Sequence, residues 1–426
     1  MEPTSLPSRC SGLLRLLPGA LLLGAGVASA AQPLALGEAE RIAVEQAPAI
    51  EGFRSRAEGA RQAAYAAGAL PDPELTLGAM ALPVDDPGLD TDPMSRLEVG
   101  LRQRFPAGRG AARERVEAQA ETAAAQAEEA ARAVRRQTRK AYLELLHRQR
   151  AIALLRESRS RFEALVEAAE REVAADRASR QDRLQAILEL ERLEDRIDRE
   201  RIALDDARAR LARWIGEAAA RRPLAQRTPE LAPPPKPAAA AERLAAHPRL
   251  AAEEARVGIG QARLREARAG YRPDWGIEVS YGHRRAERMD GSAAPDLFSV
   301  MVSMQLPLFP GNRQDRDVAA GQRRVAAAQA ERREARLELR RDLEATYARW
   351  ERLGQRQERY EKRLIPLATD NAEAALAAYR ADTVAFTALQ QARVAALEMR
   401  LSALRVEIQR LKAQAELLYL TGGGSS

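Results

Sequence analysis

Side chains that could do covalent or metal chemistry are few and scattered along this chain of 426 residues. The histidines are His147, His247 and His283, and Cys10 is the only cysteine. Met301 and Met304 have thioether sulfurs, which can bind soft metal ions, but such a pair is more often part of a barrel wall than of a metal site. No spacing matches a nucleophile with its base, a phosphate loop or a zinc site. We therefore expect a protein that is not an enzyme, with no catalytic residue, no cofactor and no resident metal.

Charge and composition narrow the class further. The formal net charge is +7, but the arginines are mostly interleaved with glutamates, as on a solvated helix face with ion pairs, so we expect no nucleic-acid partner. Only 4% of the residues are aromatic, and Ala, Arg, Glu and Leu are abundant. This composition favours long helices over a compact core.

The N-terminus has the pattern of an export signal. Arg9 and Arg15 precede an apolar stretch, Leu16 to Val27, which ends at Ala28-Ser29-Ala30. The stretch is well short of the roughly 20 residues that a spanning helix needs, so residues 1–30 are predicted to be a signal peptide rather than an anchor. Because Cys10 lies inside it, the mature chain has no thiol and must rely on packing and oligomerisation.

Two halves of the sequence repeat the same order of elements. Ala47-Pro48-Ala49-Ile50 returns about 200 residues later as His247-Pro248-Arg249-Leu250, and each opens an Ala/Arg/Glu helix. We assign residues 31–220 to a first repeat and 241–421 to a second. A proline-rich linker, 221–240, joins them, and 422–426 form a flexible tail.

Each repeat contains a pair of amphipathic strand candidates joined by a loop rich in Pro, Asp and Gly. Apolar residues alternate with polar or small ones, and period two gives a strand one apolar face. These positions are expected to face lipid: Leu97, Val99, Leu101, Ile277, Val279, Tyr281, Phe298, Val300 and Val302.

Very long helices follow the strands. Residues 111–175 contain no Gly or Pro and as one helix would reach roughly 100 Å. Each long run breaks at a short turn and returns with apolar residues every seven positions, which predicts coiled-coil packing. The heptad positions are Leu190, Ile197, Leu204 and Leu211 in one return helix, and Leu397, Leu404, Leu411 and Leu418 in the other. Pro366 predicts a bend in the second outgoing helix.

An exported chain of this kind crosses a membrane only as a closed β-barrel, because unpaired backbone groups in lipid are too costly. Four strands cannot close one, since the smallest single-chain barrels use about eight. Several copies must therefore share a barrel, with the long helices forming a second tube beneath it. The predicted fold is mainly α with a small β part.

The order of elements also resembles the TolC family of outer-membrane factors, from about Leu34 to Gly422. The segments that carry the resemblance are Val99-Gly100-Leu101-Arg102-Gln103 before Gly108-Arg109, Gln305-Leu306-Pro307-Leu308-Phe309 before Gly311, and Tyr379-Arg380-Ala381-Asp382 leading to Leu389-Gln390-Gln391-Ala392.

The resemblance implies a homotrimer in the outer membrane, in which four strands per chain build a twelve-stranded barrel and coiled-coil hairpins build an α-barrel across the periplasm. It implies a periplasmic adaptor and an inner-membrane pump of the resistance-nodulation-division class as partners. The chain would then be a passive exit duct for metal cations or drugs, with energy supplied by the pump.

Family likeness also assigns roles to the two turns. The tips that dock the adaptor would be Ala175, Asp176, Arg177, Ala178 and Ser179 in one repeat, and Ala381, Asp382, Thr383, Val384 and Ala385 in the other. Asp176 and Asp382 stand where the family usually has Gly, a place that Asp tolerates. The pore entrance would lie at Ala388 and Gln391, where related channels often have acidic residues, and at Asp182.

Two questions stay open at this point. The segment Gly108-Arg109-Gly110-Ala111-Ala112-Arg113 is similar to the branch that serves heavy-metal cation pumps, whereas no cluster of metal ligands accompanies it. The alternative function is a periplasmic coiled-coil adaptor or scaffold that never enters the membrane. It explains the signal and the heptads but not the amphipathic strands.

Overall fold

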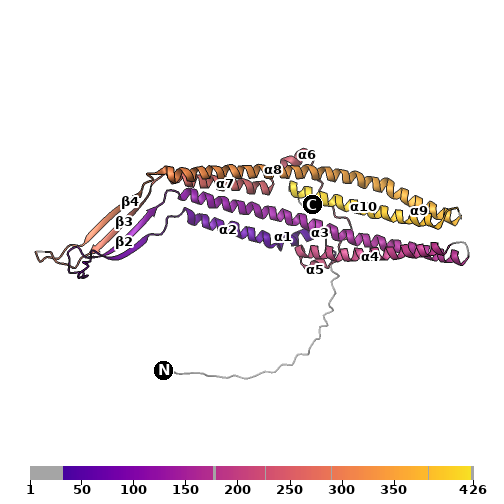
Figure 1. Ribbon diagram of the computed structural model, residues 1–426, viewed down its shortest axis with the longest axis horizontal. Helices are drawn as coiled ribbons and strands as arrows, with labels where there is room; N and C mark the ends of the chain where they lie inside the picture. Colours follow the sequence, from indigo (N-terminus) through magenta and orange to yellow (C-terminus); the bar gives the residue numbers. More distant parts are fainter. Residues whose placement is uncertain (1–31, 176–178, 226, 289, 382, 424–426) are drawn as a thin grey trace, which may run out of the picture.

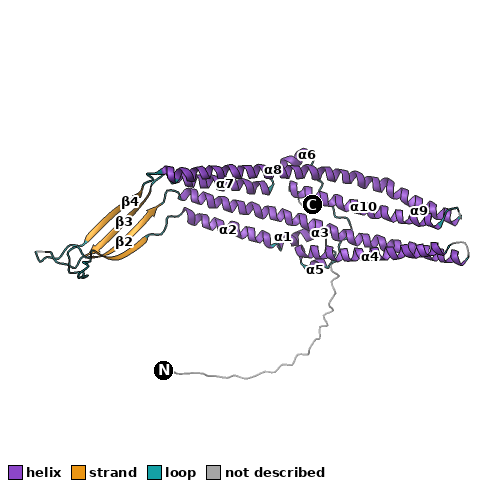
Figure 2. Cartoon of the chain, viewed as in Figure 1, coloured by secondary structure: helices purple, strands orange, loops and turns teal. Residues whose placement is uncertain are grey.

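The computed structural model describes residues 32–175, 179–225, 227–288, 290–381 and 383–423. The predicted signal peptide lies outside this range, as do Asp176, Arg177, Ala178 and Asp382 of the predicted tips. The molecule is long and narrow, with a small sheet at one end, two helical hairpins at the other, and helices lying side by side between them (Figures 1 and 2). Within the described residues, no helix is both long enough and apolar enough to cross a membrane.

The two halves have matching elements, which confirms the predicted repeat. The first half contains α1 (Leu36–Glu45), α2 (Pro48–Gly68), β1 (Glu74–Met80), β2 (Arg96–Phe105), α3 (Arg109–Ala174), α4 (Arg180–Ile215) and the short α5 (Glu217–Ala220). The second contains α6 (Pro237–Leu244), α7 (Pro248–Ala269), β3 (Asp274–His283), β4 (Leu297–Gln305), η1 (Pro310–Asn312), α8 (Gln314–Arg359), η2 (Tyr360–Leu364), α9 (Ile365–Arg380) and α10 (Phe386–Thr421).

Helix α3 is the central element of the bundle. Its 66 residues correspond to roughly 100 Å of helix, as the absence of Gly and Pro predicted. It contacts α2 and α7 along the part nearer the sheet, and α4 and α10 along the part nearer the tips (Figure 1). Its counterpart in the second half, the α8–α9 run, is contacted by α7 and α10.

The predicted heptad seams form the main core. Ile197 and Leu211 of α4, and Leu397, Leu404 and Leu418 of α10, are buried in one cluster with Leu143 and Leu155 of α3. Leu190, Leu204 and Leu411 are partly buried against the same cluster. The seven-residue spacing therefore places these side chains against the neighbouring helix, as coiled-coil packing requires.

The expected interruption before Pro366 is a π-helical turn. Residues Tyr360–Leu364 form this wider turn between α8 and α9. A proline within a helix has no N–H to donate and its ring collides with the carbonyl four residues earlier, so the backbone there must open. The long outgoing helix of the second half is in this way divided, whereas α3 is continuous.

A polar joint holds the middle of the molecule. Arg139 of α3 makes two hydrogen bonds to Glu40 of α1, Nε to Oε1 at 2.7 Å and Nη2 to Oε2 at 3.0 Å, and both side chains are almost fully buried. The hydroxyl of Tyr142 donates to the carbonyl oxygen of Leu34 at 2.9 Å. Ala225 of the linker donates its N–H to the same oxygen at 3.1 Å. The linker is therefore bound to the N-terminal segment, and α6 begins at Pro237, where a proline suits the first turn of a helix.

His247 caps the N-terminus of α7 at this joint. Its ring is fully buried, its Nδ1 accepts a hydrogen bond from the N–H of Arg249 at 3.2 Å, and Tyr419 meets it edge-on. Burial, together with the nearby charges of Arg132 and Arg249, lowers the pKa of His247 to about 4. The folded protein therefore holds a neutral imidazole.

This burial predicts a pH-dependent loss of stability. An unfolded histidine has a pKa near 6.5, so between pH 6.5 and about 4 only the unfolded chain binds the proton, and the free energy of unfolding falls by about 3 kcal/mol as the pH is lowered. His247→Asn keeps a capping acceptor and removes the titrating group. Unfolding midpoints of the detergent-purified protein at pH 7 and pH 4.5 should differ less in this variant than in the wild type. Equal differences would contradict the assignment.

Candidate functional site: the strand sheet and the helical tips

The strands form one antiparallel sheet in the order β1-β2-β3-β4, which the two halves build together. Val99 of β2 lies opposite Leu77 of β1 and Tyr281 of β3, and Tyr281 lies opposite Phe298 of β4. Residues directly opposite in an antiparallel pair share a face of the sheet. This register therefore decides which side chains gather on each face.

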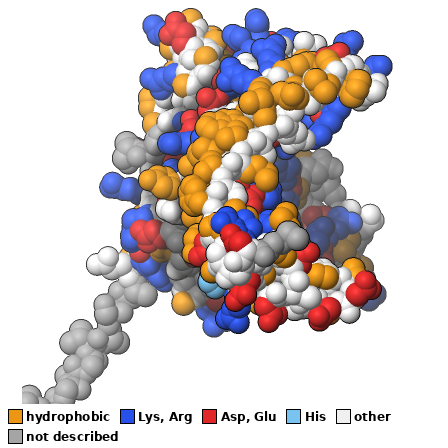
Figure 3. Space-filling model, turned by 90° about the vertical axis from the view of Figure 1, so that its left-hand side faces the viewer, with side chains coloured by type: hydrophobic (Ala, Val, Ile, Leu, Met, Phe, Trp, Pro, Cys, Tyr) orange, Lys and Arg blue, Asp and Glu red, His pale blue; other side chains and the backbone are white. Residues whose placement is uncertain are grey.

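One face of the sheet is apolar and exposed. The register places on it all the positions that the alternation singled out, namely Leu97, Val99, Leu101, Ile277, Val279, Tyr281, Phe298, Val300 and Val302. Leu75 and Leu77 of β1 extend the face, and most of these side chains are exposed, with Phe298 at 71% and Val300 at 59%. Viewed from the sheet end, hydrophobic side chains gather in a band (Figure 3). So large an exposed apolar surface marks a contact with lipid or protein.

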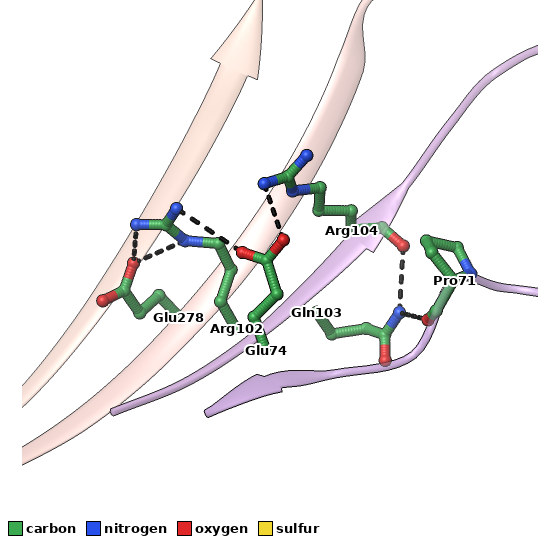
Figure 4. A network of polar contacts seen from close by, with 6 residues as sticks. All are labelled: Pro71, Glu74, Arg102, Gln103, Arg104 and Glu278. Atoms are coloured by element: carbon green, nitrogen blue, oxygen red, sulfur yellow. Dashed lines mark hydrogen bonds and ion pairs between the residues drawn. The ribbon is translucent and has the colours of Figure 1, made fainter. Parts of the chain in front are cut away.

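The opposite face carries a chain of ion pairs (Figure 4). Arg102 of β2 donates from Nε to Glu278 of β3 at 2.8 Å and lies 3.9 Å from Glu74 of β1, which also accepts from Arg104 at 2.8 Å. These links join three strands across the face. The sheet thus separates charge from apolar surface completely enough to stand between water and a nonpolar medium.

Aromatic residues lie near both ends of the apolar face. Phe105 and Trp275 stack with ring centres 4.5 Å apart where the sheet meets the helices. Tyr281 and Phe298 are opposite each other toward the loops. Trp275 and Tyr281 are separated by about 20 Å of strand. The sequence analysis did not single out Phe105 and Trp275. Extending the alternation by two residues from Ile277 reaches Trp275, whereas from Leu101 it reaches Gln103 first and Phe105 only after four residues.

The first tip is closed by a capping box. Ser179 precedes α4, and its hydroxyl accepts from the N–H of Asp182 at 3.1 Å while the Asp182 carboxylate accepts from the N–H of Ser179 at 3.1 Å. Such a pair satisfies two N–H groups that a helix start leaves free. Asp182, predicted at the pore entrance, is therefore engaged in this cap.

The second tip is closed by the backbone and by aromatic packing. The N–H of Thr383 donates to the carbonyl of Ala378 at 3.0 Å, and its hydroxyl donates to the same oxygen at 2.9 Å. Phe386 packs edge-on against Tyr379 and is buried with Leu165 of α3 and Ala186 of α4. The described tip residues Ala175, Ser179, Ala381, Thr383 and Ala385 are exposed, and Val384 is partly buried.

The structure separates the residues predicted at the pore entrance. Ala388 and Gln391 share an exposed side of α10, one turn apart. Asp182 instead lines a groove of about 720 Å³ between the two tips, and neither Ala388 nor Gln391 lines it. The entrance assignment stays a prediction for Ala388 and Gln391, while Asp182 has a structural role in the cap.

Charged contacts hold the hairpins in place behind the tips. Glu144 of α3 pairs with Lys412 of α10 and with Arg148, which also bonds Glu200 of α4 at 3.0 Å. Burial pushes the pKa of Glu144 upward, but Lys412 and Arg148 outweigh it and lower the pKa to about 2. The stabilisation is therefore complete above about pH 4.5 and is lost only as the pH falls toward 2.

No group of metal-binding side chains gathers within the described part of the chain. His147 lies on α3, His247 caps α7 and His283 ends β3, so the three histidines are on different elements.

Comparison with known proteins gives the fold. Residues 240–423 match the family described as outer membrane efflux protein. A membrane protein from Pseudomonas aeruginosa superposes with a TM-score of 0.77 at 18% identity, over 91% of this chain and 93% of that one. The outer membrane protein VceC from Vibrio cholerae superposes with a TM-score of 0.76 at 16% sequence identity, over 91% of this chain and 96% of VceC. CusC, whose structures are described in terms of transmembrane channel formation, superposes with a TM-score of 0.77 at 15% sequence identity, over 95% of this chain and 96% of CusC.

The chain has the fold of these membrane proteins. The predicted fold class, mainly α with a small sheet and two repeats, is thereby confirmed. The family match covers the second half, and the solved structures extend the likeness in fold to nearly the whole chain. A comparison with curated protein sequences finds no significant match.

Proposed function

We propose that this protein is the outer-membrane duct of an efflux assembly, a passive channel and not an enzyme. The observation that carries the proposal is the two-faced sheet, whose apolar side is exposed and whose other side is laced with ion pairs. The match of residues 240–423 to outer membrane efflux proteins supports it.

Closure of the sheet requires further copies of the chain. β1 and β4 are the outer strands, so each leaves one row of backbone N–H and C=O groups without a strand partner among the described residues. In lipid those groups must be paired, and four strands are too few to close on themselves. We propose a homotrimer in which β4 of one copy pairs with β1 of the next, so that twelve strands form a barrel with the apolar face toward lipid.

The long helices would continue the barrel as a tube through the periplasm. Transport is then passive conduction, driven by an inner-membrane pump of the resistance-nodulation-division class through a periplasmic adaptor that docks at the tips. The cargo is metal cations or drugs; Gly108–Arg113 is similar to the metal branch, but no cluster of metal ligands accompanies it in the described part of the chain. A wide water-filled duct needs no metal ligands of its own.

Complementary helix faces support the contact between copies. One exposed side of α4 carries apolar and acidic residues at helical spacing, listed as Leu184, Leu188, Asp195, Asp198, Ile202 and Asp205. The α8–α9 run at the other edge of the helix layer exposes the basic Arg356, Arg359, Lys362 and Arg363 with the apolar Leu367. Asp198 lies 18 residues after the start of α4, and Lys362 lies 18 residues before the end of α9. The two stretches thus stand at equal distances from the tips, and their charged groups, which pair within each helix in the single chain, are exposed to a neighbouring copy.

The first test is conductance in a planar lipid bilayer, with the mass of the protein measured in the same detergent. Trimers that produce single-channel current steps are the expected result. A water-soluble, non-conducting species would refute the channel and favour the periplasmic scaffold.

Placing charge on either face of β4 tests which face meets lipid. Val300→Asp puts a carboxylate on the apolar face, where an acidic residue costs on the order of 2 kcal/mol near the bilayer centre. Ser299→Asp, one residue away on the polar face, is the matched control. We expect the Val300 variant alone to insert poorly into lipid vesicles, measured as the fraction that floats with the lipid. Equal insertion of both variants would contradict the assignment.

Disulfide cross-linking tests the proposed seam between copies. Because Cys10 is the only cysteine and lies in the predicted signal, Asp198→Cys with Lys362→Cys introduces a clean pair. Oxidation should give a ladder of dimers and trimers on a denaturing gel, and neither single substitution should do so. Absence of the ladder in a preparation that conducts would disprove this seam while leaving the channel intact.

A further inference from the structure

A groove of about 670 Å³ lies where the second half of the chain passes from helix to sheet. It is lined by the end of α7, the start of β3, the end of β4 and the first turns of α8, which meet at one place in Figure 1. Residues 306–309 give it apolar surface. The charged side chains that line it are four arginines and three carboxylates, namely Arg263, Arg272, Arg313, Arg324, Glu266, Asp274 and Asp317.

The strand residues of the groove show which side of the sheet it is on. Asp274 and Gln305 are opposite each other in the β3–β4 pair, and the next pair along, Trp275 and Met304, belongs to the apolar face. Successive side chains of a strand point to opposite faces, so Asp274 and Gln305 are on the face that carries the ion pairs. In the proposed barrel this face encloses the duct.

The helix residues continue the same side. On α8, Arg313, Asp317 and Arg324 follow one another at intervals of one turn and two turns, so they share one side of the helix. Together with the strand residues they place the groove on the wall of the duct, directly below the barrel, once in each copy.

Two of the three carboxylates in the groove are already engaged. Glu266 accepts a hydrogen bond from Nε of Arg115 on α3 at 3.1 Å. Asp274 accepts one from the backbone N–H of Ala107 at 2.7 Å. Asp317 is the one carboxylate of the lining without such a contact among the described residues.

The four arginines of the groove are not neutralised. Within the part of the chain that the structure describes, none of them has a carboxylate within ion-pair distance, and Asp317 reaches none of them. Arg265, at the same level of α7 but outside the groove, pairs with Glu114 of α3 at 2.6 Å. Since Arg115 balances Glu266, the groove has a surplus of positive charge beside an apolar surface.

We infer that this groove binds organic anions on their way through the duct, with a carboxylate, sulfonate or phosphate on the arginines and an apolar body against residues 306–309. Guanidinium groups suit such anions because their N–H donors match two oxygens at once. A cation would be repelled at this place. The inference rests on the proposed function and adds the class of cargo, which it assigns to anionic compounds with an apolar part.

The test uses carboxyfluorescein, an organic anion with an aromatic body, and the full-length protein in detergent. The groove variant is Arg313→Gln with Arg324→Gln. Its matched control is Arg227→Gln with Arg243→Gln, two exposed arginines near the linker with the same total charge change. A third variant, Asp317→Asn, removes the carboxylate that competes with the ligand. Binding is measured by fluorescence anisotropy at two salt concentrations.

We expect wild type and control to bind the dye alike, more weakly at high salt, and the groove variant to bind it about fivefold more weakly. Asp317→Asn should bind it about twofold more tightly, a change that a poorly folded variant would not produce. Equal affinity in the wild type, the groove variant and Asp317→Asn would overturn the inference.

Current through a planar bilayer tests whether the groove opens into the duct. Dye added to the water should reduce the current of wild-type channels, and should reduce it less in the groove variant. Binding without any effect on the current would place the site outside the duct and overturn the inference. Conductance without dye reports on the duct itself, so a failure of the proposed function would be seen separately.

Discussion

The packing of one continuous helix determines the rest of this molecule. Along its 66 residues, α3 meets α2, α4, α7 and α10, and its buried side chains run through the main core from Ala131 to Phe162. A helix of this length is not stable by propensity alone, because isolated helices depend on an apolar face packed against partners. The sheet at one end and the tips at the other are therefore held apart by a rod whose rigidity comes from its neighbours. Any deformation that reaches the tips must pass along these seams.

Features that depend on local spacing could be predicted from the sequence. The return helices end at Ile215 and Thr421, next to Gly216 and Gly422, whose positive φ angles suit a helix end. The strands could be predicted from period-two alternation. The interruption of the helix near Pro366 could be predicted because proline has no N–H to donate. Contacts between distant residues could not be predicted in this way. Glu40 and Arg139 are one pair among many acidic and basic residues, and only the packing of α1 on α3 decides that they meet in a buried site. The groove at the tips likewise needs four helices to be placed before its arginines become neighbours.

The sheet shows why a single copy is incomplete. Its apolar face extends across all four strands and its ion pairs join β1, β2 and β3, yet the outer strands β1 and β4 end the hydrogen-bonded ladder. Charged pairs in water add little stability, but Arg102 bridges Glu74 and Glu278 across three strands and so fixes their register. In the proposed trimer, pairing of β4 with β1 of an adjacent copy would complete this ladder, and the apolar face of the sheet would then be continuous around the barrel.

At the tips, stability and recognition place opposite demands on the same few residues. The two hairpins must stay together, and Phe386, Leu389 and Leu165 achieve this by burying one small cluster. Asp182 starts α4 through its capping box with Ser179 and also lines the groove between the hairpins. A fully neutralised groove would be more stable alone but would offer a partner only apolar surface, which discriminates poorly. The groove that the tips form has Glu172 and Asp182 as well as arginines around its apolar floor, so both signs of charge are present at its rim. The tip sequence therefore combines an apolar cluster that holds the two hairpins together with a charged rim that remains accessible at the end of the molecule.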